Sequence, residues 1–474
     1  MKPNVILVEF NELTPSLMER FIAAGSLPVF GRLRRESRIF ITEAAERDPD
    51  YLDPWIQWVT VHTGLNYEEH KLFKLNEGHL LKGKSIWDEL ARRGMTNWIC
   101  GSMNTSYEDG YSGALLPDPW TTEVEPTPAA LKPFFNFVQR HVLEHTSGSV
   151  EMTSSEYVDF GKFLLSHGLS AGTVASTLRQ LGGEQVGRAK FKRASVLDQI
   201  QFDVFRSYLK STSPAFSTFF ANSTAHFQHA YWPHFEPAKF DGLFVESESQ
   251  MADAIHFGYR QMDELMGKFL SLAGENTVVI FATALSQEPC RDFARQTGRA
   301  FYRPRKIDAL LHAAGVENHR KTAPVMTQQF HVDFDNEADA AEAKSRLGAL
   351  RIDGEHVLNV EPNGCRILVG CRSNRRFSQD ATISGSRVSA TIPFVELFYE
   401  LETVKAGVHH PDGMLWIRMP DRIGTPEMRV PLSAVAPTVL TILGIEPPKH
   451  MKTAPIDLFA AGATQAPVLT GRLR

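Results

Sequence analysis

Hydrophobic residues in this chain form short apolar runs, each followed by a segment with one apolar side. Residues 5–8 read Val-Ile-Leu-Val, and apolar positions then repeat with helical spacing over 17–22. Apolar runs predict further strands at 216–220 and 277–283, and one-sided spacing predicts a helix over 251–272. Strands that are apolar throughout are typical of parallel sheets covered by helices on both faces. The pattern therefore predicts an α/β protein with a mostly parallel central sheet flanked by helices.

Two stretches depart from this pattern, and we interpret them as insertions. The first is rich in proline, then in serine and glycine, and ends with helical spacing. The second has a β-α-β-β order that begins with an alternating strand at 329–334. These features predict core segments at 1–106, 211–324 and 381–460, a mainly helical insertion at 107–210, a small α+β cap at 325–380, and a flexible tail at 461–474.

Composition narrows the class of protein. The 474 residues are 43% hydrophobic and carry a formal net charge of -5, which suits a large globular core and disfavours a nucleic-acid partner. Four cysteines without a CxxC pair argue against a disulfide scaffold or a zinc ribbon. Glu9 interrupts the first apolar run, and no run reaches the roughly 20 residues of a membrane span. We therefore expect a cytoplasmic protein, and its oligomeric state stays open.

Five short motifs follow one another along the chain. They are Asn11-Glu12-Leu13-Thr14-Pro15 with Gly25-Ser26-Leu27-Pro28, Trp58 with Thr63-Gly64-Leu65 and His70, Gln228-His229-Ala230-Tyr231-Trp232, the 407–413 segment around His409, and Ala436-Pro437-Thr438 with Leu443-Gly444. In this order they resemble the type I phosphodiesterase and nucleotide pyrophosphatase-like branch of the alkaline phosphatase superfamily. The two insertions lie outside the motifs.

The resemblance implies a site where two divalent metals clamp a phosphate and activate a Ser or Thr nucleophile. This sequence keeps only part of that site. His229 and His409 match two ligand positions, and Asn11 stands where an Asp is expected. The remaining positions have changed: Pro54 falls at or beside the nucleophile, Ala225 replaces an Asp, and Thr283-Ala284-Leu285-Ser286 replaces Ser-Asp-His-Gly. We therefore expect fewer than two divalent metals, zinc or manganese, or none.

Glu9 and Asn11 join His229 and His409 as candidate metal ligands. Glu9, Asn11 and Glu12 cluster at the end of the first predicted strand. Ligands of open parallel sheets gather at the carboxyl ends of the strands, which favours a functional role for this cluster. The alternative is that Asn11 or Thr14 caps the following helix and the glutamates interact favourably with its dipole.

Asp53, Gln57, His226 and His410 are the candidate catalytic residues. Asp53 stands beside the nucleophile position and could replace the missing nucleophile or act as a base. Gln57 lies about one turn further along, where a buried amide needs partners. His226 and His410 each lie close in sequence to a histidine of the metal set. Each also has a structural alternative, because Asp-Pro marks turns and the other residues suit packing or solvated loops.

Two functions are compatible with these residues. The first is a phosphodiesterase-like hydrolase or transferase that acts on a phosphate or sulfate ester of a small molecule or glycoconjugate. The alternative is a catalytically inactive protein of the same fold that binds a ligand or a protein partner. Ala225, Ala284 and Leu285 indicate a lost site, whereas the retained polar residues favour a working site of different design. The enzyme hypothesis requires His229 and His409 to share one cleft.

Overall fold

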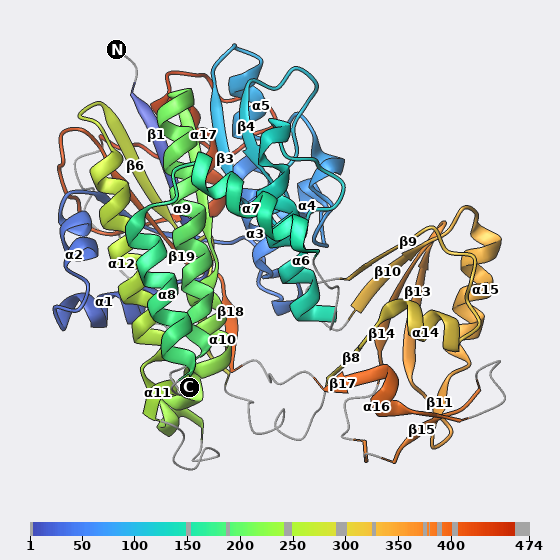
Figure 1. Ribbon diagram of the computed structural model, residues 1–474. Coiled ribbons are helices and arrows are strands. Elements are labelled where there is room, and N and C mark those ends of the chain that lie inside the picture. The colour runs from blue at the N-terminus through green and yellow to red at the C-terminus, as the bar shows by residue number, and fades with distance from the viewer. Residues whose placement is uncertain are drawn as a thin grey trace, which may run out of the picture.

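An eight-stranded sheet forms the centre of the larger of two units (Figure 1). The computed structural model describes residues 3–147, 153–185, 190–240, 249–290, 301–324, 329–372, 377–378, 380–385, 391–400 and 406–459. In spatial order the strands are β20 (Met428–Pro431), β2 (Arg38–Glu43), β19 (Asp412–Arg418), β6 (Thr277–Ala282), β1 (Asn4–Phe10), β5 (Phe216–Ala221), β3 (Asn97–Cys100) and β4 (Gly113–Leu116). Only β19 is antiparallel to its neighbours in this sheet. The predicted α/β class with a mostly parallel sheet is confirmed.

Helices cover both faces of this sheet because side chains on its buried strands alternate between two hydrophobic cores. On β1, Ile6, Val8 and Phe10 belong to one core, and Val5 and Leu7 belong to the other. The first core includes residues of α1 (Pro15–Ala23), α2 (Pro28–Arg35), α9 (Arg193–Thr212), α10 (Ser223–Phe235) and α12 (Ala254–Leu272). The second includes residues of α3 (Pro54–Thr63), α5 (Ile86–Ala91) and α17 (Val435–Ile442).

Helix α3 is buried on every side along its whole length. Pro54 occupies its first turn, where the missing backbone N–H would have no helical partner anyway. Gly64 ends the helix with a φ of 68°, a left-handed conformation that glycine adopts without strain. Asp53 precedes the helix with extended backbone. These signals place Asp53 at the start of a helix that is packed tightly against the sheet.

The segment predicted as a helical insertion contributes directly to the large core. It contains α6 (Lys132–Ser147), α7 (Ser154–Ser166), α8 (Ala171–Gln185) and most of α9. Strand β4 also falls within 107–210, yet it pairs with β3 in the central sheet. Helix α9 packs against β3 and β5, so it forms part of the cover of the sheet.

Short elements complete the core. Strands β7 (Ser286–Pro289) and β18 (Gly407–His410) form an antiparallel pair beside the main sheet. The other short elements are α4 (Tyr67–His70), α11 (Ser249–Ala252) and the single helical turns Pro49–Tyr51, Gly78–Leu81, Ala129–Leu131, Lys190–Lys192, Pro237–Phe240 and Leu432–Ala434. No helix in the described ranges has both the length and the apolar character needed to cross a bilayer.

A smaller α+β unit has a hydrophobic core of its own and lies beside the large one (Figure 1). Its antiparallel sheet has the order β13 (Leu358–Asn363), β14 (Arg366–Cys371), β10 (Gln329–Asp333) and β9 (Lys321–Pro324). Its other elements are α14 (Ile307–Ala313), α15 (Glu337–Gly348), α16 (Phe394–Leu397) and the strand pairs β8 (Tyr302–Pro304) with β17 (Phe398–Glu400), β11 (Arg351–Ile352) with β12 (Glu355–His356), and β15 (Thr382–Ile383) with β16 (Ile392–Pro393). The unit therefore extends beyond the predicted 325–380 on both sides, because β8 and β17 are too short to give a sequence pattern.

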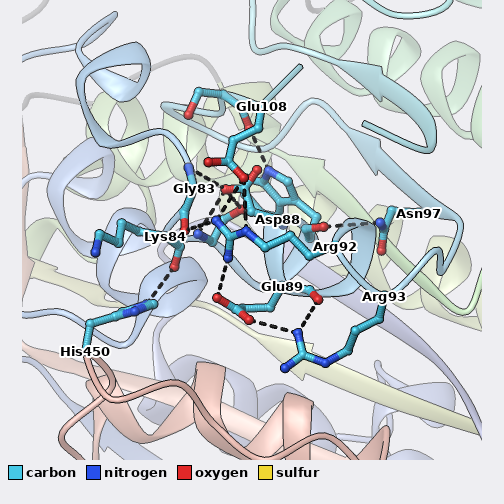
Figure 2. A network of polar contacts seen from close by, with 12 residues as sticks. Gly83, Lys84, Asp88, Glu89, Arg92, Arg93, Asn97, Glu108 and His450 are labelled. Carbon is cyan, nitrogen blue, oxygen red and sulfur yellow. Dashed lines mark hydrogen bonds and ion pairs between the residues drawn. The ribbon is translucent and has the colours of Figure 1, made fainter. Parts of the chain in front are cut away.

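Figure 2 shows a polar network that holds the start and end of α5. The Asp88 carboxylate accepts hydrogen bonds from Ser85 and from the backbone N–H of Gly83, which caps the helix. Arg92 pairs with Glu89 on the same helix and with Glu108 on a neighbouring loop. Because these contacts join the helix to adjacent loops, the network is a structural anchor for this part of the second core.

Candidate functional site

Polar side chains meet at the carboxyl ends of the central strands, where open α/β sheets place their ligands. Asn11 and Glu12 directly follow β1, and α10, which carries His229, begins directly after β5. His409 lies on β18 opposite Gln287 of β7. The structure brings Glu12, His229 and His409 together at this edge of the sheet.

Glu12 lies between the two imidazoles. Its Oε2 atom is 3.0 Å from His229 Nε2 and 3.3 Å from His409 Nε2. The ring centroids of the two histidines are 5.3 Å apart. Glu12 is fully buried and has a φ of 60°, a conformation that is uncommon for a residue other than glycine and that recurs at functional sites. The two histidines thus share one cleft, as the enzyme hypothesis requires.

Each imidazole also has an acceptor at its Nδ1 atom. His229 Nδ1 is 2.9 Å from the carbonyl oxygen of Gly407, and His409 Nδ1 is 3.4 Å from Asp53 Oδ1. A proton on Nδ1 suits both contacts, and the charged imidazole carries a second proton on Nε2 toward Glu12. Within the described part of the chain, His409 Nε2 is buried and makes no hydrogen bond. A metal that binds through Nε2 would displace the proton on that atom, while the Nδ1 proton would keep its acceptor.

These donor atoms fit one divalent cation. One carboxylate oxygen and two imidazole nitrogens lie within 4.8 Å of one another. Zinc bonds of about 2.0–2.2 Å place tetrahedral ligand atoms about 3.4 Å apart. The separations of 3.0 and 3.3 Å from Glu12 to the imidazoles are close to that spacing. Two histidines and one glutamate also leave a coordination position open, which is typical of catalytic rather than structural zinc sites.

The surroundings keep Glu12 ionised. Burial raises the pKa of its carboxyl, but the positive charges of His409 and His229 outweigh burial and hold that pKa well below its usual value. Asn11 Nδ2 donates to Glu12 Oε1 at 2.7 Å, and Gln287 Nε2 donates to Oε2. A bound metal cation could take the place of the imidazolium protons, because its positive charge would also balance the buried carboxylate.

Asn11, a predicted metal ligand, lies beside this group, and its amide oxygen already accepts a hydrogen bond. Trp58 Nε1 donates to Asn11 Oδ1 at 2.8 Å, while Asn11 Nδ2 donates to Glu12 and to Asn222 Oδ1. The observed contacts of Asn11 therefore position the Glu12 carboxylate.

Glu9, the fourth predicted ligand, lies apart from His229 and His409. Its Oε1 atom is 2.8 Å from His62 Nε2, and Ser102 Oγ donates to its Oε2 atom at 2.6 Å. Side chains alternate along a strand, so Glu9 points toward the face of β1 that is covered by α3. The structure thus pairs Glu9 with buried residues of the second core instead of with the metal candidates.

Two of the four predicted catalytic residues adjoin the site. Asp53 contacts His409, and the next residue, Pro54, lines the cavity described below. His226 lines the same cavity from the exposed side of α10. The predicted helical spacing of His226 and His229 is therefore present, and His229 contacts Glu12.

The other two predicted catalytic residues have different surroundings. Gln57 Nε2 donates to Glu46 Oε2 at 3.1 Å and to the carbonyl oxygen of Tyr51 at 2.8 Å. Because α3 is buried all round, sequence spacing gives no indication of which way Gln57 points. His410 Nδ1 accepts from the backbone N–H of Asp412 at 3.2 Å. Successive residues of a strand face opposite ways, so His410 does not follow its neighbour into the cluster.

A cavity of about 750 Å³ opens onto the histidine cluster. Its wall includes Glu12, His229 and His409, and also residues of α3, α6 and α9. Gln329 of β10 and Phe301 bring the small unit to the same wall. The volume lies within the range of about 300–1,000 Å³ that is usual for ligand sites.

Glu12 belongs to the predicted polar cluster, but it is not among the predicted ligands. Its position directly after Asn11 at the end of β1 was the available signal. Ala225 of α10, which replaces an expected Asp, lines the same cavity as Glu12, so the carboxylate here follows β1 instead of lying on α10. The sequence is compatible with Gln287 either in the same pocket or in a loop, and its contact with Glu12 depends on the long-range pairing of β7 with β18.

Three comparisons relate the chain to known proteins. No protein-family model matches the sequence, and no curated protein matches it. Similar solved structures include phosphonoacetate hydrolase from Sinorhizobium meliloti 1021 (11% identity, TM-score 0.40, 93% of this chain and 96% of that chain), murine ectonucleotide pyrophosphatase/phosphodiesterase 5 in complex with AMP (10%, 0.40, 95% and 97%) and alkaline phosphatase PafA (12%, 0.45, 96% and 98%). All three belong to the alkaline phosphatase superfamily, whose motifs the sequence resembles.

Proposed function

We propose that this protein is a hydrolase or transferase of phosphate or sulfate esters that works with one divalent cation, zinc or manganese. The convergence of Glu12, His229 and His409 at the wall of a ligand-sized cavity supports this most strongly. These three residues would hold the cation, and Asp53 would orient His409 through its Nδ1 atom. When bound, the cation would polarise an ester oxygen and stabilise the charge that develops on it.

One cation, rather than the two that the resemblance implies, suits the remaining residues. Glu12 supplies the carboxylate that Ala225 cannot provide. A second cation would find few ligands, because the Asn11 oxygen accepts from Trp58, and the side chains of Ala284 and Leu285 are apolar and buried. Hard cations need oxygen or imidazole donors, which those two positions lack.

Asp53 and His226 are the residues that we propose to act on the ester. The Asp53 side chain is one-quarter exposed and touches His409, so it can reach a reacting group beside the cluster. It can accept a proton from an attacking hydroxyl or attack as a carboxylate. His226 lies on the cavity wall, where an imidazolium can donate a proton to the departing oxygen. Gln57 and His410 have other contacts, and we assign them no chemical role.

The charge of the cavity favours an ester with a single negative charge. None of the described residues that line it is a lysine or an arginine. A dianionic monoester would therefore meet Glu12 with only the imidazoles and one cation to balance it. A diester or a sulfate ester carries one negative charge, which that site balances more fully.

The second candidate function is a binding protein without turnover. Pro54 at the expected nucleophile position favours it, since proline has no hydroxyl to activate. In that case Glu12 and the histidines would bind the ligand, with or without the cation, and no ester bond would break.

Metal content and turnover together test the proposal. We expect one zinc or manganese ion per chain in wild-type protein, measured by elemental analysis after loading and desalting. Glu12→Gln and His409→Ala should each lower the metal affinity by tenfold or more, because each removes one of three ligands. Wild-type protein should hydrolyse bis(p-nitrophenyl) phosphate or a nitrophenyl sulfate, and chelation should remove this activity.

His450→Ala is the matched control, because His450 is a half-buried histidine that contacts the Lys84 carbonyl in the network of Figure 2. This variant should keep both the metal and the activity. Wild-type protein that binds no added zinc or manganese would contradict the metal site. Metal binding without turnover of either ester class would favour the binding-protein function instead.

A further inference from the structure

The cavity next to the histidine cluster has a large apolar wall. Three aromatic and three aliphatic side chains from α3, α6, α9, β5 and adjacent loops contribute to it: Trp55, Met103, Trp120, Val138, Leu197 and Phe220. Trp55 Nε1 already donates to the carbonyl oxygen of Phe73, so its ring adds apolar surface without an unmet donor. These residues reach the cavity from several elements, and the wall is therefore part of the folded core and not a single exposed loop.

The two acidic residues on the wall outside the cluster are engaged by the protein itself. Asp118 accepts from the backbone N–H of Asn104 at 3.0 Å and from Thr121 Oγ1 at 2.6 Å. Asp198 accepts from Ser223 Oγ. Burial raises the pKa of Asp118 to about 6 and that of Asp198 to about 7, so near pH 7 Asp198 is partly protonated, while the charge of Asp118 is held by its hydrogen-bond donors. With no lysine or arginine among the described lining residues, this wall offers little to a charged group.

We propose that this wall binds a hydrocarbon group of the ester, so that the substrate is an amphiphile with its anionic ester at the histidine cluster. This inference rests on the proposed function, and it adds the substrate class. The charged end and the apolar end of such a molecule would contact two parts of one continuous cavity. Apolar surface that leaves water on binding contributes about 0.8 kcal/mol per methylene, which is about a fourfold gain in affinity.

A homologous ligand series tests the inference separately from catalysis. The methyl, butyl and octyl monoesters of methylphosphonic acid each carry one negative charge and differ only in chain length. We expect their affinity for the metal-loaded protein, measured by isothermal titration calorimetry, to rise with chain length. The octyl ester should bind at least 30-fold more tightly than the methyl ester, which allows for incomplete burial of the chain.

Two cavity variants and one control locate the binding surface. Leu197→Lys places a charge on the half-buried wall, and Ala194→Phe narrows the cavity from the same helix. Each should reduce the octyl-to-methyl affinity ratio to below fivefold while methyl-ester binding persists. Leu178→Lys should keep the full ratio, since Leu178 lies on α8 with 64% of its surface exposed. Circular dichroism of each variant checks folding.

The outcomes separate this inference from the proposed function. Equal affinities for the three esters would overturn it even if nitrophenyl esters are hydrolysed. A ratio that falls only in Leu178→Lys would also overturn it, because the chain would then bind to an exposed helix surface. A chain-length effect that depends on Leu197 and Ala194 would sustain it even if no ester is turned over.

Discussion

Two buried carboxylates near the cavity have opposite acidities because their neighbours differ. Two imidazoles next to Glu12 hold its pKa well below the usual value in spite of burial. Burial raises the pKa of Asp198 to about 7, because the hydroxyl and backbone donors that it meets at the start of α10 are neutral. Burial alone therefore does not determine whether a carboxyl group is ionised here, because the charge of its neighbours decides the direction of the pKa shift.

Asp198 should make stability depend on pH. In the unfolded chain an Asp titrates near pH 3.9, whereas in the folded protein its pKa is about 7. Between these values the folded state binds more protons, so the free energy of unfolding should fall as pH rises and level off above pH 7. Asp198→Asn should remove this loss, with the difference between variant and wild type growing by up to about 1.4 kcal/mol per pH unit.

Urea unfolding at pH 4.5, 5.5, 6.5 and 7.5 measures this difference. Asp159→Asn is the control, because Asp159 lies on α7 with 64% of its side chain exposed. A difference between Asp198→Asn and wild type that stays constant across this range would show that the carboxyl titrates normally.

At the scale of elements, strands that are apolar throughout could be predicted well from sequence. Strands β1 and β6 and helix α12 fall close to the predicted ranges, because each has a strong local pattern. Strands β7 and β18 have no such pattern, and they exist through pairing with each other across the chain. That pairing sets His409 opposite Gln287, which explains why the motif order located the histidine and not the amide that supports the site.

At the site, too, only features with a local pattern or a motif in the sequence could be predicted. His229 and His409 could be placed together because the motif order carried long-range information. Glu9 and Glu12 could not be distinguished, since the direction of each side chain depends on where β1 ends and the chain turns. Gln57 could not be oriented either, because α3 is apolar on all sides and gives no preferred face.

Gly64 at the end of α3 and Gly94 shortly after α5 have the same left-handed backbone conformation but different surroundings. Gly64 and Gly94 have φ of 68° and 69°. A Cβ on Gly64 would lie 3.2 Å from Met451 and 3.3 Å from the Ser433 carbonyl oxygen, whereas one on Gly94 would meet nothing within 4 Å. We expect Gly94→Ala to cost about 1–2 kcal/mol from left-handed strain alone. Gly64→Ala should cost a further 1–3 kcal/mol or so from crowding.

Urea unfolding of the two alanine variants measures both effects. Equal losses of stability would indicate that the Gly64 surroundings relax and that the close approach of α3 to the 433–451 segment contributes nothing.

At the scale of the whole molecule, the small unit and the large core are separate hydrophobic clusters that share the cavity wall. Lys321 of β9 pairs with Glu123 of the large core at 3.3 Å, and Gln329 lines the cavity. An exposed ion pair of this kind contributes less than about 1 kcal/mol. The internal packing of each unit should therefore exceed the coupling between them.

We expect the two units to unfold in separate steps. Ile367 belongs to the core of the small unit and Ile280 to the large core, and neither is exposed. Each Ile→Ala change should cost about 2–5 kcal/mol. Ile367→Ala should lower only the transition of the small unit in scanning calorimetry and leave metal affinity unchanged, whereas Ile280→Ala should lower the other transition.

A single transition that both substitutions shift equally would show that the molecule unfolds as one cooperative body.

The residues proposed to hold the cation come from the beginning, the middle and the end of the chain: Glu12, His229 and His409. A bound metal ion would link three segments that emerge from the ribosome at very different times. The site cannot be complete until β18, which carries His409, has emerged and paired with β7, so a truncated or half-synthesised chain would not retain the ion. Loading with metal would then report that the entire large core has been assembled.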